Sequence, residues 1–303
     1  MWHALYITIV STVFLGLAFG TDLSSTCEKN GVAPFCESMV RGLPGVTQPA
    51  KPETLLLPRS TFERVRRSPV PNIKEMLSLE TDWLSYHIFN ELLPAATLRA
   101  GFGKTMISNN TVANLNGSRQ VVISRPSSSG SSLCNNETIK LFSGLGDSAT
   151  IVEEDIPFDY GLIHIIDHPL TLPRPVSESL VRIGETNFVQ ELQQAGLKDE
   201  VDKTPNVTCF APTNQALASI TQVDNLTPAQ RFTLLSNHVV FGTTAYSPDL
   251  IDGASLTTTA GTAITVSRRG GDLFLDGARV LQSDVITING VCHVIDKLES
   301  PLR

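Results

Sequence analysis

Four histidines of this chain occupy repeat-related positions, and histidine often performs acid–base chemistry near neutral pH. Two of them lie in segments that match each other at a constant offset of 129 residues. The matching positions are Asp155-Ile156, Gly161, His164 and Asp167 in the first copy, and Asp284-Val285, Gly290, His293 and Asp296 in the second. The other two, His87 and His238, lie in a second pair of similar segments upstream. The repeat predicts two related domains in tandem, each needing the same two histidines.

The surroundings of these histidines favour structure over catalysis. His164 and His293 are framed by apolar residues typical of a buried strand, where one ring nitrogen usually bonds to a backbone carbonyl. Asp167 and Asp296 precede turns that contain proline, and a histidine and an aspartate three residues apart on a strand point to opposite faces. A nucleophile elbow of the form Gly-x-Ser-x-Gly does not occur in the sequence. We therefore expect no enzyme activity, no metal and no cofactor.

Length and composition agree with two domains and exclude two classes of partner. The chain has 303 residues, of which 41% are apolar, enough for two modest cores. Its net charge of −7 has the wrong sign for binding nucleic acid or for docking on an anionic membrane. Neither partner is expected.

The first twenty residues have the composition of a secretory signal peptide. They contain no Asp, Glu, Lys or Arg, and they end in the small-x-small pattern Ala18-Phe19-Gly20. An uncleaved signal anchor is the competing interpretation, although Thr8 and Ser11 interrupt the apolar run. After cleavage we expect no membrane span, and the C-terminal residues lack the hydrophobic tail of a GPI signal. The sequence predicts a secreted protein, with the vacuole as the alternative destination.

Five glycosylation sequons support the secretory route. They are Asn109, Asn116, Asn136, Asn206 and Asn225. The first three surround the Ser-rich tract 124–132, which can bury little and is interpreted as an exposed loop.

The cysteines follow the repeat only in part. Cys209 and Cys292 occur in the second copy, and the corresponding places of the first copy have no cysteine. Joint presence and absence favours a disulfide between neighbouring strands, and the alternative is a pair of small buried core residues. Of the remaining three, Cys27 and Cys36 form our weaker pairing, which leaves Cys134 without an assigned partner.

Helix signals come first in the second copy, and short strands separated by glycine turns follow, which indicates an α+β fold. Three ordered motifs then resemble the fasciclin domain. They are Cys209-Phe210-Ala211-Pro212-Thr213-Asn214, then Asn237-His238, then Gly290 to Asp296 with His293 inside. The first copy is similar in its second and third motifs only. We therefore divide the chain into a leader (1–20), a poorly ordered segment (21–50), a degenerate fasciclin domain (51–172) and a fasciclin domain (173–301).

The resemblance implies two tandem wedge-shaped β-sandwich domains with flanking helices. It also implies adhesion or matrix or cell-wall association, with a cell-surface or matrix protein or a glycan as partner. The adhesive positions proposed for the family fall on Tyr86-His87 and Asp155-Ile156 in the first copy, and on Asn237-His238 and Asp284-Val285 in the second. A soluble lipid- or glycan-binding module is the alternative, and a hydrolase is the third possibility. Residues Arg64–Arg67 match a convertase processing pattern, for which a solvated helix face is the competing interpretation.

Overall fold

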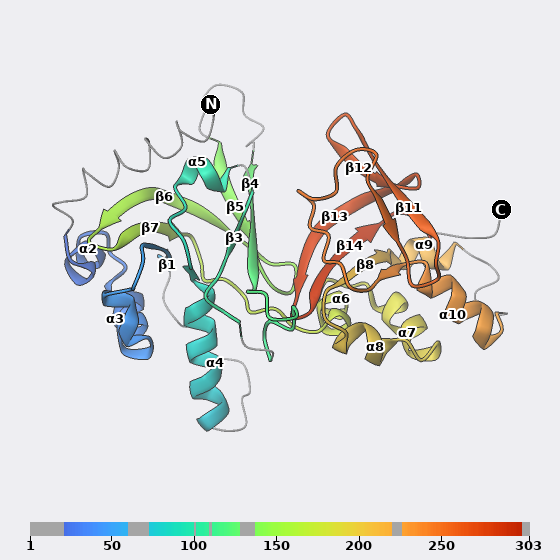
Figure 1. Cartoon of the computed structure of the whole chain (residues 1–303), viewed down its shortest axis with the longest axis horizontal. Coiled ribbons are helices and arrows are strands. Elements are labelled where there is room, and N and C mark those ends of the chain that lie inside the picture. Colours follow the sequence, from blue (N-terminus) through green and yellow to red (C-terminus); the bar gives the residue numbers. More distant parts are fainter. Residues whose placement is uncertain are drawn as a thin grey trace. The chain divides into compact units, whose positions relative to one another are not determined.

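The computed structural model divides the chain into two compact units that are not contiguous in sequence (Figure 1). It describes residues 21–59, 73–99, 101–108, 111–127, 137–219 and 226–298. Unit 1 consists of residues 1–106, 124–141 and 149–170, and unit 2 of residues 107–123, 142–148 and 171–303. The main segment of unit 2 begins at residue 171, next to the predicted boundary, and two segments that precede this boundary also belong to unit 2.

Unit 1 is built on a seven-stranded sheet of order β2-β1-β7-β6-β5-β4-β3. Its strands are β1 (Glu53–Pro58), β2 (Ile88–Phe89), β3 (Phe102–Lys104), β4 (Val121–Ser127), β5 (Thr138–Phe142), β6 (Ser148–Phe158) and β7 (Gly161–Ile166). Its helices are α2 (Leu23–Lys29), α3 (Ala33–Gly42), the 3-10 helix η1 (Pro44–Thr47), α4 (Ile73–Tyr86) and α5 (Ala95–Leu98). A bridge between Phe89 and Thr105 joins the two sheet edges and closes the sheet on itself.

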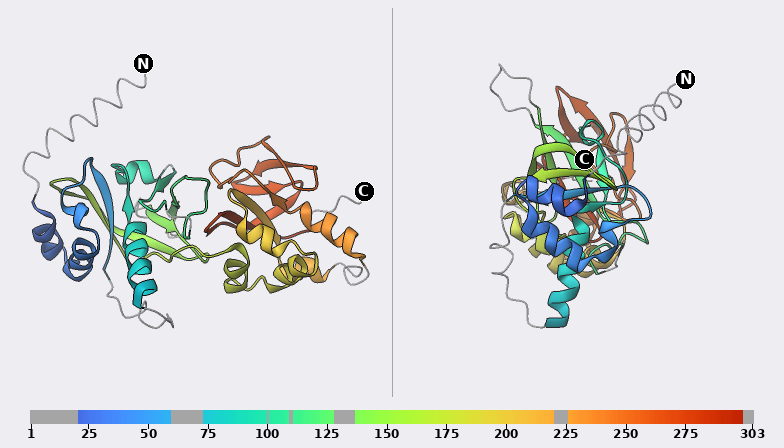
Figure 2. Two further views of the ribbon diagram at one scale, coloured as in Figure 1. Left: turned by 60° about the horizontal axis from the view of Figure 1, so that its bottom comes forward. Right: turned by 90° about the vertical axis from the view of Figure 1, so that its left-hand side faces the viewer.

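Unit 2 repeats this plan with the sheet order β10-β11-β12-β13-β14-β8-β9. Its strands are β8 (Val207–Pro212), β9 (Val239–Val240), β10 (Ser255–Thr257), β11 (Ala263–Arg269), β12 (Asp272–Leu275), β13 (Ala278–Thr287) and β14 (Gly290–Ile295). Its helices are α6 (Val176–Arg182), α7 (Thr186–Gln194), α8 (Lys198–Lys203), α9 (Asn214–Ala218) and α10 (Pro228–Ser236). In each unit one central pair is parallel, β1 with β7 and β8 with β14. The predicted α+β class and the two related units are confirmed, and Figure 2 shows helices and a sheet in each unit.

Local signals explain where the helices of unit 2 begin and end. Thr227 accepts from the backbone N–H of Gln230, whose side chain bonds back to Thr227, and this capping box starts α10. Gly184 has a φ of +97° and separates α6 from α7, so this stretch forms two helices and not one. Gly196, with a φ of +73°, follows the C-cap of α7, where a glycine readily adopts this conformation.

The segment 21–50 forms part of the fold, and the prediction that it is poorly ordered is wrong. Helices α2 and α3 form a hairpin that the Cys27–Cys36 disulfide closes. Phe35 on α3 packs against the ring of His87, with centroids 5.1 Å apart, and α7 places Phe188 5.8 Å from His238 in the same way. The hairpin therefore does for unit 1 what α6 and α7 do for unit 2. Sequence analysis missed it because Phe35 lies outside the recognised motifs.

Buried polar bonds extend unit 2 beyond the predicted second domain. Gln120 is fully buried, and its side-chain amide donates to the carbonyls of Val112 (3.0 Å) and Thr287 (3.1 Å). Asn114 donates from its side chain to the carbonyl of Lys203 at 2.8 Å. Segment 107–123 thus completes unit 2 although it precedes the second repeat.

Candidate functional site

The histidines of the last motif hold a bulge in the preceding strand. In unit 1 the backbone N–H of Asp155 donates to His164 Nδ1 at 3.2 Å, and His164 Nε2 bonds to the Leu93 carbonyl at 2.8 Å. Unit 2 has the same arrangement: Asp284 N–H to His293 Nδ1 at 3.4 Å, and Nε2 to the Ala245 carbonyl at 2.9 Å. Because Nδ1 accepts, the ring proton lies on Nε2. Both rings are buried, and burial lowers the pKa of His164.

The histidines of the middle motif are equally structural. His87 Nε2 accepts from the backbone N–H of Leu170 at 2.9 Å, and its Nδ1 donates to the Trp83 carbonyl at 2.8 Å. His238 Nδ1 bonds to the Leu234 carbonyl at 3.0 Å. Burial lowers the pKa of both His87 and His238 to about 4, so both are neutral at pH 7.

The middle-motif residues offer little surface to a partner. Tyr86, His87 and His238 are fully buried, and Asn237 is 3% exposed. The side chain of Asn237 donates to the Thr233 carbonyl at 2.8 Å. These four positions, which the family resemblance predicts to be adhesive, therefore expose little or no side-chain surface. The two histidines are buried at equivalent places in both units, which indicates that both units need them for folding.

The aspartates before the last motif fasten a loop to the bulged strand. Asp155 and Asp284 have φ values of +58° and +61°, a conformation that aspartate tolerates better than most residues. Asp155 Oδ1 accepts from the backbone N–H of Ala95 at 2.9 Å, and Asp284 Oδ1 accepts from Ser247 N–H at 2.8 Å. Asp284 is buried together with Val285, whereas Asp155 is exposed. Among the expected adhesive positions, only Asp155 and its neighbour Ile156 reach the surface.

The glycine of the last motif allows close approach of a parallel strand. A Cβ on Gly161 would lie 1.9 Å from the Glu53 carbonyl oxygen, and one on Gly290 would lie 1.8 Å from that of Val207. No side chain fits at such a distance, so only glycine is compatible with both positions.

The aspartate that ends the motif fixes the start of the bulged strand. Asp167 Oδ1 accepts from Thr150 N–H at 2.8 Å, and Asp296 Oδ1 accepts from Arg279 N–H at the same distance. Every polar residue of the repeated motif thus has a matching backbone partner in both units.

Cys209 and Cys292 lie opposite each other on β8 and β14. Their predicted proximity is correct, but both are free thiols in the structure, so the predicted disulfide is absent. Burial raises the pKa of Cys292 well above its ordinary range, and the adjacent Cys209 thiol adds to this effect. Leu55 and Ile163 form the corresponding pair in unit 1. The two cysteines of unit 2 are thus replaced together in unit 1 because the two side chains pack against each other.

The opening motif of the second copy links β8 to the helices. Phe210 stacks on His293 with ring centroids 5.8 Å apart, and Ala211 and Pro212 complete β8. The Thr213 side chain caps α9. Asn214 accepts from the backbone N–H of Asn187 at 2.9 Å and donates to the Gly184 carbonyl, so it ties down the α6–α7 connection. These residues position elements and contain no reactive group.

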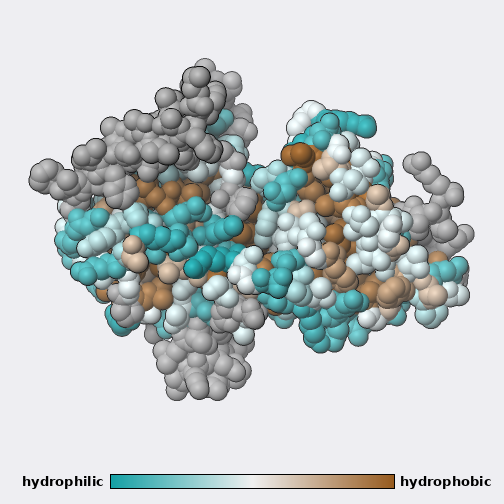
Figure 3. All heavy atoms as spheres, viewed as in Figure 1, coloured by the Kyte–Doolittle hydropathy of each residue, from teal (hydrophilic) through white to brown (hydrophobic). Residues whose placement is uncertain are grey.

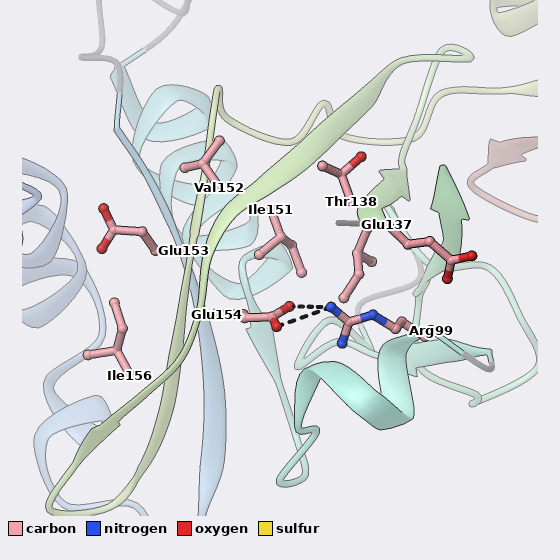
Figure 4. Close-up of a pocket in the computed structure, with 9 residues that line it drawn as sticks. Arg99, Glu137, Thr138, Ile151, Val152, Glu153, Glu154 and Ile156 are labelled. Atoms are coloured by element: carbon pink, nitrogen blue, oxygen red, sulfur yellow. Dashed lines mark hydrogen bonds and ion pairs between the residues drawn. The ribbon is translucent and has the colours of Figure 1, made fainter. Parts of the chain in front are cut away.

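An open groove of about 650 Å³ lies on unit 1 beside the bulge of β6 (Figure 4). Its lining is aliphatic and charged: Arg99, Glu137, Thr138, Ile139, Ile151, Val152, Glu153, Glu154 and Ile156. Arg99 donates to both carboxylate oxygens of Glu154, at 3.1 and 2.8 Å, and Figure 4 shows the two side chains pointing toward each other. Ile156 belongs to the expected adhesive pair. Arg99 was missed because it lies in no repeated motif.

Apolar side chains reach the surface in both units, where Figure 3 shows them interspersed with hydrophilic ones on the face drawn. Val152 on β6 is 43% exposed, and Leu281 at the same repeat position of β13 is 54% exposed. In each strand one register shift spans this residue and a second follows directly after it. Bulges of this kind turn a side chain out of the regular alternation, which accounts for the two exposed aliphatic residues.

Two buried threonines, which bond to backbone groups in equivalent ways, were also missed because they lie in apolar strands. Thr54 Oγ1 donates to the Glu91 carbonyl at 2.9 Å and accepts from Leu93 N–H at 2.8 Å. Thr208 makes the equivalent bonds to Thr243 and Ala245. A threonine as the second residue of a mainly apolar strand, in both β1 and β8, could have revealed this pair from the sequence.

Comparison with known proteins identifies the family. The model of the fasciclin domain matches residues 40–173 and 184–301. The chain belongs to the fasciclin domain family. It is 35% identical over 157 residues to a fasciclin-like arabinogalactan protein of Cercospora beticola, covering 51% of this chain and 42% of that protein. A protein of the same description from Arthroderma benhamiae is 34% identical over 160 residues, with coverage of 52% and 38%.

More distant fasciclin proteins are also similar. Human periostin is 28% identical over 123 residues, which cover 38% of this chain and 14% of periostin. A solved domain pair from the insect cell adhesion molecule fasciclin I has a TM-score of 0.42 at 20% identity, covering 90% of this chain and 98% of that one. The chain spans less than half the length of the two arabinogalactan relatives.

Several expected features can be placed only in part. Asn116 is exposed at a turn, and Asn206 is partly exposed with a φ of +56°. Asn109, Asn136, Asn225, Cys134, the leader 1–20 and Arg64–Arg67 lie outside the described residues. Within the described ranges, no helix is long and apolar enough to span a bilayer, and no group of three or more His, Cys, Asp or Glu is arranged to hold a metal ion.

Proposed function

We propose that this fasciclin-domain protein is secreted and glycosylated, and that it attaches to a cell-surface or matrix partner without catalysing a reaction. The leader, the sequons and membership of the fasciclin family support secretion. The names of its relatives include arabinogalactan proteins and periostin, which supports a wall or matrix setting.

The observation that carries the proposal is the difference in burial between the two copies. Asp284 and Val285 are buried, whereas the same two positions in unit 1 are an exposed Asp155 and a half-buried Ile156 beside the groove. Aliphatic side chains exposed next to charged ones on a rigid strand are suited to a protein contact. The attachment surface is therefore the β6 side of unit 1.

The histidines support a non-catalytic role. His87, His164 and His293 each have both ring nitrogens engaged with backbone groups. A general base needs a free nitrogen within hydrogen-bond reach of its substrate. The hydrolase alternative would have to recruit other residues.

Retention on intact cells of the producing organism tests this function. Purified secreted protein is compared with a Val152→Ser/Ile156→Ser variant. The matched control is Leu281→Ser, which removes an equally exposed aliphatic residue from the same repeat position of unit 2. Losing two aliphatic contacts should weaken retention by roughly tenfold or more, and the control should be retained like the wild type. Full retention of the double variant, lost only after enzymatic removal of N-glycans, would assign attachment to the glycans and reject this surface.

A further inference from the structure

Strand β6 and its counterpart β13 both extend past the strand that precedes them. In unit 1 the backbone N–H of Ser143 donates to the Asp147 carbonyl, and counting back along this hairpin places Thr138, the first residue of β5, opposite Val152. In unit 2 Leu275 pairs with Ala278, so the first residue of β12, Asp272, lies opposite Leu281. The second halves of β6 and β13, residues 153–158 and 282–287, therefore extend past the described strands β5 and β12 by the same length, while their other edges pair with β7 and β14.

In unit 2 another segment covers this projecting half. Gly144 forms a parallel bridge with Ile286. A Cβ on Gly146 would lie 3.0 Å from Gln282 Nε2 and 4.0 Å from Val285 Cγ2, so the turn rests directly on these side chains. Residues 144–146 thus act as a short added segment on the edge of β13 and help to bury Val285.

In unit 1 the described residues cover only the far end of the corresponding edge. Asp159 N–H donates to the Thr21 carbonyl, as Ile288 N–H donates to the Arg174 carbonyl in unit 2. No described residue forms a bridge to Pro157 equivalent to that between Gly144 and Ile286. The groove lined by Glu153 and Ile156 occurs where residues 144–146 lie in unit 2.

Charge separates the two edges. Gln282 and Ser283 in the covered copy correspond to Glu153 and Glu154 in the open copy. The arginines that pair with the two glutamates, Arg59 and Arg99, form solvent-exposed ion pairs, which contribute little and can exchange partners. Glu137 adds a third carboxylate to the groove. In unit 2 the covering turn ends in the acidic residue Asp147. At the carboxylate-rich edge of unit 1, a segment with a basic residue at that place should bind better than one with an acidic residue.

We propose that the projecting half of β6 is a docking edge for a short basic segment of a partner protein. The segment lies along the β6 edge against Ile156, where Pro157 offers a backbone carbonyl but no N–H, and it directs a lysine or arginine to Glu153 and Glu154. This inference rests on the proposed function, because it names the chemistry of the partner at the same surface.

Two peptides based on the chain's own covering turn test the proposal. One has the sequence of residues 142–148, Phe-Ser-Gly-Leu-Gly-Asp-Ser, and the other has lysine in place of the aspartate. Each is titrated into the full-length protein by NMR at low salt. One or two exposed ion pairs should make the dissociation constant of the lysine peptide roughly three- to tenfold lower than that of the aspartate peptide. Amide exchange should slow at residues 153–156 and at Phe158 when the lysine peptide binds, since Pro157 has no amide hydrogen.

Substitutions that give unit 1 the residues of unit 2 provide the matched control. Glu153→Gln/Glu154→Ser should remove the preference for the lysine peptide, whereas Glu178→Gln/Glu200→Gln, at exposed acidic positions of α6 and α8, should keep it. Equal binding of both peptides, or a preference that survives the first double variant, overturns the proposal. A concentration-dependent dimer that Ile156→Asp abolishes would assign the edge to a second copy of this chain and also overturn it. If the peptides fail while Val152→Ser/Ile156→Ser still loses retention on cells, the partner chemistry is wrong and the proposed function stands.

Discussion

Val285 and Ile156 occupy the same repeat position, yet Val285 is fully buried and Ile156 is half-buried beside an open groove. The difference arises outside the repeated motif, because residues 144–146 rest on β13 and no described residue takes their place on β6. The motif itself performs the same structural task twice. Functional differences between the copies therefore lie in what surrounds the motif.

Acid should destabilise the protein through its buried histidines. His87 and His238 have a pKa of about 4 in the folded protein and 6.5 when exposed, so the unfolded chain binds more protons between these values. The free energy of unfolding should be highest above pH 6.5, where these histidines are neutral in both states. It should fall as the pH drops toward 4, by roughly 3 kcal/mol per histidine at the lower end. Urea unfolding between pH 7.5 and 4.5 measures this.

A His238→Gln variant separates this effect from carboxylate titration. It should be less stable than the wild type at pH 7.5, and its free energy of unfolding should vary less between pH 6.5 and 5. An identical pH slope in both proteins would show that His238 does not resist protonation.

Gly290→Ala should prevent unit 2 from folding normally. The added Cβ would meet the Val207 carbonyl oxygen at 1.8 Å, and the parallel strands β8 and β14 would have to separate. A loss of roughly 4 kcal/mol or more is expected in thermal or urea unfolding. Gly101→Ala is the control, because nothing lies within 4 Å of its Cβ position. Similar stability of both variants would contradict the close-approach explanation.

Cys209 and Cys292 should resist thiol reagents in the folded protein and react after unfolding without a reductant. Both are fully buried, and the raised pKa of Cys292 keeps its thiol protonated. Iodoacetamide labelling followed by peptide mapping reads both sites. Labelling that requires prior reduction would show that the two cysteines are bonded, as their sequence pattern suggested.

Phe35→Ala should destabilise unit 1 by roughly 3 to 5 kcal/mol, as large-to-small changes in a core usually do. Phe35 is 4% exposed and packs against both Trp83 and His87. Exposed Phe232 on α10 provides the control, since its replacement by alanine should change stability little. An unchanged melting temperature for Phe35→Ala would mean that the α2–α3 hairpin is dispensable.

The repeat predicted the number of units, their α+β class and the family, because short motifs at a fixed offset encode bulges, close approaches and buried bonds. Gly161 and Gly290 show why this works, since each is required by the strand beside it. Exposure could not be predicted in the same way. Tyr86 has a polar hydroxyl and a place in a motif, and only the packing around it reveals its burial.

Contacts made by segments outside the motifs were beyond the reach of sequence reasoning. Gln120 belongs to none of the repeated motifs, yet its buried side-chain amide donates to the Thr287 carbonyl and so completes unit 2. The groove depends on the unequal lengths of β5 and β6 and on the placement of Arg99, which follows α5. Such features arise from tertiary arrangement, which periodicity does not report.

Amide hydrogen exchange of the full-length protein, free and bound to isolated cell-surface material, tests most directly the claim that attachment uses the open edge of unit 1. Binding should slow exchange at residues 152–156 and 158 of β6, which carry the exchangeable amides of this edge. The equivalent residues 281–287 of β13, whose edge residues 144–146 partly cover, should be unchanged. Protection confined to 281–287, or absent from residues 152–156 and 158 while the protein is bound, would contradict it.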